Sequence, residues 1–145
     1  MRLVIQRVSS TSVSVKNSVV GEIDKGLFIL VGVTEGDTKE NADLLAEKLS
    51  KLRIMADDED KMNLSVVDVD ASILVVSQFT LYADCSKGNR PSFIKAAEPK
   101  LAEEIYDYFI ESLKGLGIKV ETGKFGAYMD IGTKLDGPVT IILEK

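Results

Sequence analysis

Hydrophobic and polar positions alternate through the first part of the chain, as they do in half-buried β-strands. β-branched residues are frequent there, and Gly21 and Gly26 stand at turn-like positions. Residues 27–33 are then apolar except for Gly32, which is typical of a central strand covered on both faces. The pattern predicts strands over residues 3–8, 12–16, 19–23 and 27–33.

Helical periodicity follows in two places. Asp37 and Glu40 have the spacing of a capping box that opens a helix, and the apolar residues from Ala42 to Leu52 form one stripe. This pattern predicts an amphipathic helix lying on a sheet. Pro99 suits the first turn of a second helix, and two glycines after its apolar stripe end it.

A second buried strand is predicted over residues 73–82, with the polar residues Ser77, Gln78 and Thr80 in its middle. Polar groups at such positions need partners, because burying one unpaired costs roughly 1 to 3 kcal/mol. Residues 83–93 read as a loop.

The remaining chain, residues 118–145, returns to strands with two glycine-rich interruptions. Residues 57–61 (DDEDK) lack the ligand spacing of a calcium loop and are interpreted as a solvated turn. Strands, helix, strand, helix and strands in this order predict an α+β fold in one domain, residues 1–145.

Composition removes several kinds of catalytic site. The 145-residue chain has no histidine, which excludes serine–histidine and cysteine–histidine pairs and histidine metal ligands. Its one cysteine, Cys85, can form neither an internal disulfide nor a thiolate zinc cluster. We therefore expect no metal and no cofactor, and any hydrolysis must find its base elsewhere.

Charge and hydropathy bound the partners and the compartment. The chain has 18 basic and 23 acidic residues, a net charge of −5, which argues against nonspecific binding of duplex nucleic acid. A local basic patch stays compatible with this balance. No apolar run approaches the roughly 20 residues of a membrane helix, and the alternating residues 1–7 lack a signal-peptide core. We expect a cytoplasmic protein.

The segment from Ser77 to Thr80 is the first candidate for chemistry. Hydroxyl and amide groups near a strand end can bind an acyl group, and free backbone N–H groups there can polarise its carbonyl. The alternative is that Ser77 and Thr80 only satisfy cross-strand hydrogen bonds. As a nucleophile Thr80 would need an adjacent base, and none is evident in the sequence, so a binding role is the better interpretation.

Three further features have structural and functional interpretations. Cys85 would be nucleophilic if a neighbouring cation lowered its pKa, but a lone thiol is usually incidental. Lys87 and Arg90 form a flexible basic loop, suited to phosphate or simply solvated. Gly137-Pro138 marks an ordinary turn or a cis peptide bond.

Several separated motifs, in order and at family length, resemble the bacterial and eukaryotic type of D-aminoacyl-tRNA deacylase. They cover nearly the whole chain and are MRLVIQRV at its start, KMNLS at residues 61–65, SQFTLYAD at 77–84, RPSF at 90–93, Phe125-Gly126-Ala127 with Met129, and GPVT at 137–140.

The resemblance implies a homodimer that hydrolyses the ester between a D-amino acid, or glycine, and the terminal adenosine of tRNA. It implies a compact β-rich fold with sandwich-like or barrel-like sheets and two helices. Ser77, Gln78, Phe79 and Thr80 would line the aminoacyl pocket, with Met129 in the substrate site.

The family is also held to have a cis Gly-Pro bond, here Gly137-Pro138, that enters the partner subunit's site and excludes L side chains. The resemblance also implies that the 2′-hydroxyl of the tRNA takes part in the chemistry, while backbone N–H groups near Phe79 and Thr80 would stabilise the oxyanion. This fits a chain without histidine.

The chain departs from the family pattern at two positions. Leu135 stands where the family usually has Asn, and Asn89 where it often has Arg. Arg7, which the pattern places near the Gly-Pro loop, would supply the support that Leu135 cannot. A basic rim of Lys87, Arg90 and Lys124 would bind the single-stranded end of tRNA weakly and in a salt-sensitive way.

Two other functions remain open at this point. One is a noncatalytic, oligomeric RNA-binding module of the same fold. The other is a hydrolase of small esters that uses a thiol or hydroxyl of the protein. The three differ in whether D-aminoacyl-tRNA is cleaved and whether tRNA is needed.

Overall fold

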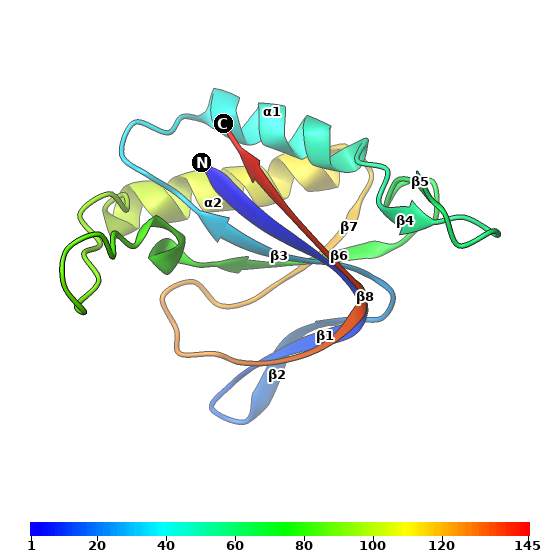
Figure 1. Ribbon diagram of the computed structural model, residues 1–145, viewed down its shortest axis with the longest axis horizontal. Helices are drawn as coiled ribbons and strands as arrows, with labels where there is room; N and C mark the ends of the chain where they lie inside the picture. The colour runs from blue at the N-terminus through cyan, green and yellow to red at the C-terminus, as the bar shows by residue number, and fades with distance from the viewer.

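A curled mixed sheet with two helices on one side forms the architecture of the computed structural model, which describes residues 1–145 (Figure 1). The α+β prediction is confirmed. The elements in chain order are β1 (Arg2–Val15), β2 (Ser18–Ile23), β3 (Gly26–Gly32), α1 (Lys39–Ser50), β4 (Met55–Ala56), β5 (Met62–Leu64), β6 (Ser72–Ser77), the 3₁₀ helix η1 (Phe79–Tyr82), α2 (Pro99–Gly115), β7 (Lys119–Thr122) and β8 (Asp130–Glu144).

The strand order is β2-β1-β3-β6-β7, with β8 paired to β1 as well. β3, β6 and β7 run parallel to one another, and the other pairs are antiparallel. β2 also lies against β7, so the sheet curls until it is nearly closed. The predicted separation of residues 3–8 from 12–16 is wrong, because Ser10 pairs with Lys134 of β8 and keeps β1 continuous.

Two hydrophobic clusters occupy the two faces of this sheet. Side chains alternate along β6, so Ile73 and Val75 join the cluster beneath the helices, whereas Leu74 and Val76 join the cluster inside the curl. All four are at most 1% exposed. This double burial explains the continuous apolar runs of β3 and β6 and confirms the predicted covered central strand, which runs over Gly26–Gly32 and ends before Val33.

Both helices cover the same face of the sheet, and α1 packs against α2 (Figure 1). Pro99 begins α2 as predicted. The predicted capping box of α1 is wrong: Thr38 is the N-cap, and its backbone N–H and hydroxyl both donate to the side chain of Asn41. Asp37 makes a different contact, because it faces the chain's first residue.

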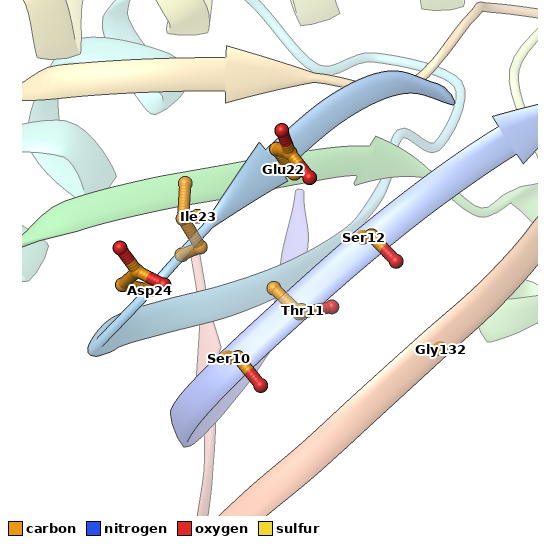
Figure 2. Close-up of a pocket in the computed structure, with 7 residues that line it drawn as sticks. All are labelled: Ser10, Thr11, Ser12, Glu22, Ile23, Asp24 and Gly132. Atoms are coloured by element: carbon orange, nitrogen blue, oxygen red, sulfur yellow. The ribbon is translucent and has the colours of Figure 1, made fainter. Parts of the chain in front are cut away.

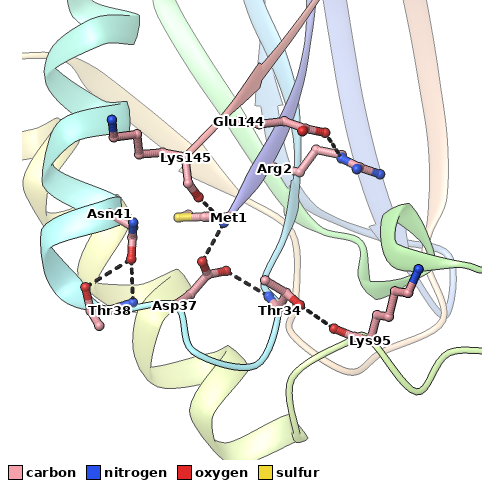
Figure 3. Close-up of polar contacts among 9 residues, drawn as sticks. All are labelled: Met1, Arg2, Thr34, Asp37, Thr38, Asn41, Lys95, Glu144 and Lys145. Carbon is pink, nitrogen blue, oxygen red and sulfur yellow. Dashed lines mark hydrogen bonds and ion pairs between the residues drawn. The ribbon is translucent and has the colours of Figure 1, made fainter.

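Asp37 joins the ends of the chain to the turn after β3 (Figure 3). The ammonium group of Met1 donates to Asp37 Oδ1 at 2.5 Å and to the carbonyl oxygen of Lys145 at 2.6 Å. The second carboxylate oxygen of Asp37 accepts the Thr34 N–H at 2.8 Å, and the Thr34 hydroxyl donates to the Lys95 carbonyl at 2.5 Å. This series of contacts fixes the segment around Lys95 against the end of β3.

The acidic segment 57–61 connects β4 and β5 as an exposed turn. Asp57 accepts hydrogen bonds from the backbone of Glu59 and Lys61 and from the amide of Asn63. The interpretation as a solvated turn is confirmed. Neither helix is long and apolar enough to cross a membrane.

We expect Asp37→Ala to lower the free energy of unfolding by about 3 kcal/mol, since it leaves a buried ammonium group without its carboxylate. Urea denaturation measures the change. Glu47→Ala, which removes an exposed ion pair with Lys51, is the control and should leave the stability nearly unchanged. Equal stability of Asp37→Ala and the wild type would contradict this role of the ion pair.

Candidate functional site at the end of strand β6

The polar residues of the first candidate segment lie where β6 ends. Ser77 pairs with Val31 in the last step of the parallel ladder, and the Gln78 N–H then donates to the Val31 carbonyl at 2.7 Å. The chain turns into η1 at Phe79, so the predicted strand over 73–82 is wrong beyond Ser77. Because β3 itself ends one residue after Val31, no neighbour remains for β6 to pair with.

The first residues of η1 leave two backbone donors free of the helix. Phe79 and Thr80 open the helix, where N–H groups have no acceptor one turn earlier. The Gln78 amide donates to the Thr80 hydroxyl at 2.5 Å, and Arg2 donates to the carbonyl of Leu81 at 2.5 Å. These contacts hold the segment in place, and Phe79 and Thr80 are themselves exposed residues.

A cavity of about 620 Å³ lies beside this segment. Its volume is in the range of small-molecule sites, and most of its lining is hydrophobic. No lining residue is charged and none is a cysteine. The lining comprises Val31, Val33, Val76, Ser77, Gln78, Phe79, Phe93, Ala96, Ala97, Pro99, Ala102, Phe125, Gly126, Ala127, Tyr128, Met129 and Ile131.

The cavity brings together four of the predicted site residues, Ser77, Gln78, Phe79 and Met129. Thr80 is exposed beside it, with its hydroxyl bonded to Gln78. The hydroxyl has no basic side chain within hydrogen-bonding distance, as the sequence interpretation of Thr80 requires.

Besides the predicted Phe79, the cavity lining includes the aromatic residues Phe93, Phe125 and Tyr128, which the sequence did not assign to the site. The rings of Phe79 and Phe93 meet edge to face with centroids 5.1 Å apart. Tyr128 also lines the cavity and is 89% exposed. Phe93 reaches the cavity because Thr34 pairs with Ala96 across the fold. No local pattern in the sequence could have shown this long-range pairing.

Gly137 and Pro138 do not line the cavity of their own chain. They lie in a bulge of β8, because Gln6 pairs with Thr140 and Val8 with Leu135, which leaves residues 136–139 opposite Arg7 alone. The Gly137-Pro138 peptide bond is cis. Gly137 has a φ of +125°, a backbone conformation that favours glycine.

The Arg7 side chain supports this bulge through polar contacts. This side chain is 10% exposed; Nη1 donates to the Ile54 carbonyl at 3.0 Å, and Nε lies 3.1 Å from Asp136 Oδ2 and 3.3 Å from the Asp136 carbonyl oxygen. Asp136 therefore supplies polar support next to Leu135, whose side chain cannot.

The basic loop is exposed and is closed at its base by an ion pair. Lys87 and Arg90 have no ion-pair partner in the structure. Asp84 pairs with Ser92 through the backbone, and its carboxylate lies 3.4 Å from Lys95 Nζ. Hydrogen bonds from Ser86 and Lys95 lower the pKa of Asp84 to about 2, so the carboxylate stays charged at neutral pH. The side chains of Lys87 and Arg90 are therefore two unpaired basic groups on this loop.

A second hollow, of about 370 Å³, lies elsewhere on the sheet (Figure 2). Ser10, Thr11 and Ser12 of β1 contribute hydroxyls, and Glu22 and Asp24 contribute carboxylates. None of the predicted site residues lines this hollow, and no lysine or arginine lines it. Its acidic lining repels phosphate, so it does not fit a nucleic-acid end.

Comparison with known proteins identifies similar chains over the full length. A family model described as D-Tyr-tRNA(Tyr) deacylase matches residues 4–144. The D-aminoacyl-tRNA deacylase of Bacillus cereus (strain G9842) is 53% identical over 145 residues, which are 100% of this chain and 99% of that protein.

Two solved structures have the same fold. One, titled "c-Myc DNA Unwinding Element Binding Protein", has a TM-score of 0.93 and 38% identity, and the match covers 100% of this chain and 99% of that one. The other, titled "Structural Analysis of a probable eukaryotic D-amino acid tRNA deacylase", has a TM-score of 0.84 and 18% identity, with 98% and 97% covered. At that identity the second likeness concerns the fold alone.

Proposed function

The chain belongs to the D-Tyr-tRNA(Tyr) deacylase family and is a hydrolase of the ester bond in D-aminoacyl-tRNA, and we propose that it proofreads chirality. It removes D-amino acids and mischarged glycine from tRNA and spares L-aminoacyl-tRNA. The observation that carries this proposal is the cavity beside Ser77, Gln78 and Phe79, which is apolar and has no charged lining residue.

A cavity without a charged nucleophile or base takes its reactive groups from the substrate and water. A water oxygen bonds to the ester carbonyl carbon, and the bond from that carbon to the 3′-oxygen of the terminal adenosine breaks. The neighbouring 2′-hydroxyl passes its proton to the departing 3′-oxygen and takes up a proton from the attacking water, so the products are the free amino acid and a terminal adenosine with both hydroxyls intact. The backbone N–H groups of Phe79 and Thr80 stabilise the negative charge that develops on the carbonyl oxygen.

Selection against L-amino acids comes from a second copy of the chain. In a homodimer, Gly137 and Pro138 of the partner subunit enter the cavity and meet the α-amino region of the substrate. The position of these residues in a bulge of β8, away from their own cavity, supports this arrangement. Only hydrogen fits on the blocked side, so one steric rule admits both D-residues and glycine.

The tRNA is held by few phosphate contacts. Lys87 and Arg90 lie in one exposed loop and Lys124 lies next to the lining residue Phe125, so a small basic rim is available despite the net charge of −5. Because the ester is at a single-stranded 3′ end, such a rim suffices, and binding weakens as salt is added. The protein acts in the cytoplasm, where charged tRNA is used.

The test is release of the amino acid from D-tyrosyl-tRNA, L-tyrosyl-tRNA and glycyl-tRNA, each with and without the terminal 2′-hydroxyl. We expect hydrolysis of the D-tyrosyl and glycyl esters only, and loss of both reactions with the 2′-deoxy substrates. Hydrolysis of the L-ester at an equal rate would contradict chiral selection. A folded protein that cleaves none of the three would be a noncatalytic RNA-binding module instead.

Thr80→Ala should lower kcat/KM for D-tyrosyl-tRNA about tenfold and not abolish it, because the substitution removes one hydrogen bond and keeps the backbone N–H. Single-turnover kinetics measures the loss. Thr133→Ala, which removes the hydrogen bond to Thr11, serves as the matched control and should retain wild-type kinetics. Complete loss of activity in folded Thr80→Ala would identify Thr80 as a nucleophile.

A further inference from the structure

We propose that Tyr106 is a positioning residue for the cavity: its hydroxyl fastens α2 to the junction from which two chain segments continue into the cavity lining. Tyr106 lies on α2, does not line the cavity, and is only 2% exposed. The inference rests on the proposed function of this cavity.

One carbonyl oxygen is the point of attachment. The Tyr106 hydroxyl donates to the carbonyl oxygen of Val75 at 2.9 Å. The N–H of Gly123 donates to the same oxygen at 3.0 Å. A side chain of α2, a residue of β6 and the first residue after β7 therefore meet at a single buried acceptor.

The two segments separate directly after this point. The parallel pairing of β6 and β7 ends with Val75 opposite Thr122. Beyond Val75 the chain continues into the lining residues 76–79, and beyond Gly123 it continues into the lining residues 125–129. The end of the β6–β7 pairing therefore sets the positions of residues 76–79 and 125–129 in the cavity lining.

Packing at this junction leaves little free space. A Cβ atom at Gly123 would lie 2.7 Å from Met129 Sδ and 3.2 Å from a methyl group of Val76, which joins both segments in close contact. The ring of Tyr106 packs against Phe125 with centroids 5.8 Å apart. A small displacement at the junction therefore shifts Phe125 and Met129 relative to residues 77–79, and ester cleavage depends on such alignment.

The hydroxyl is not needed to fill space, since a phenylalanine ring would occupy the same volume. Val75 would also keep one donor, from Gly123, without it. Burial raises the pKa of Tyr106, so its hydroxyl remains a proton donor over the working range of pH. Its contribution is to fasten α2 to the junction.

Tyr106→Phe tests this, with Tyr108→Phe as the matched control. Tyr108 is on the same helix, and its hydroxyl donates to Asp43 of α1 at 3.0 Å, outside the cavity. We expect Tyr106→Phe to lower kcat/KM for D-tyrosyl-tRNA about tenfold, mostly through kcat. The Tyr108→Phe variant should retain wild-type kinetics. Wild-type kinetics in folded Tyr106→Phe would overturn the proposal.

Amide hydrogen exchange provides a readout that does not need activity. Exchange of residues 123–129 should accelerate in Tyr106→Phe and stay unchanged in Tyr108→Phe. If the wild-type protein cleaves no aminoacyl-tRNA, the proposed function fails, and this measurement alone decides whether Tyr106 holds the junction. Unchanged exchange in Tyr106→Phe would overturn its role there.

Discussion

Parallel pairing of β6 with β3 on one side and β7 on the other determines where the walls of the cavity lie. β6 is buried on both faces, so its direction cannot change without loss of both hydrophobic clusters. Its last ladder position, Ser77 opposite Val31, places residues 77–79 at the cavity, and the chain that leaves β7 brings residues 125–129 to the same cavity. The rigid strands thus position a site that consists mainly of loop and turn residues.

The sequence predicts much of this scaffold because burial leaves a clear periodic signal. The apolar run 27–33 and the stripes of both helices correspond to observed elements, whereas the strand over 73–82 fails after Ser77. Apolar and polar residues continue past that point, but the neighbouring strand does not. The actual cap of α1 also differs, because Asp37 binds the ammonium group of Met1, a partner far away in the sequence.

The candidate site is predictable only in part, because contacts between residues far apart in the sequence leave no local pattern. Ser77, Gln78, Phe79 and Met129 were expected in one place from the family resemblance, and all four line the cavity. Phe93, Ala96 and Ala97 were missed, because a long-range pairing of Thr34 with Ala96 brings them there. The residues around Phe93 and Ala96 in the sequence show no pattern that predicts this contact.

We propose that the Gly137-Pro138 bulge of a second copy of the chain completes each cavity. Two inactive variants test it when mixed under conditions that let subunits exchange: Ala127→Arg, which blocks the cavity, and Gly137→Val, which distorts the bulge. Half of the reassembled dimers are mixed and have one intact cavity facing an intact bulge, so about a quarter of wild-type deacylation should return. No recovery, with mixed dimers shown to form, would contradict the account.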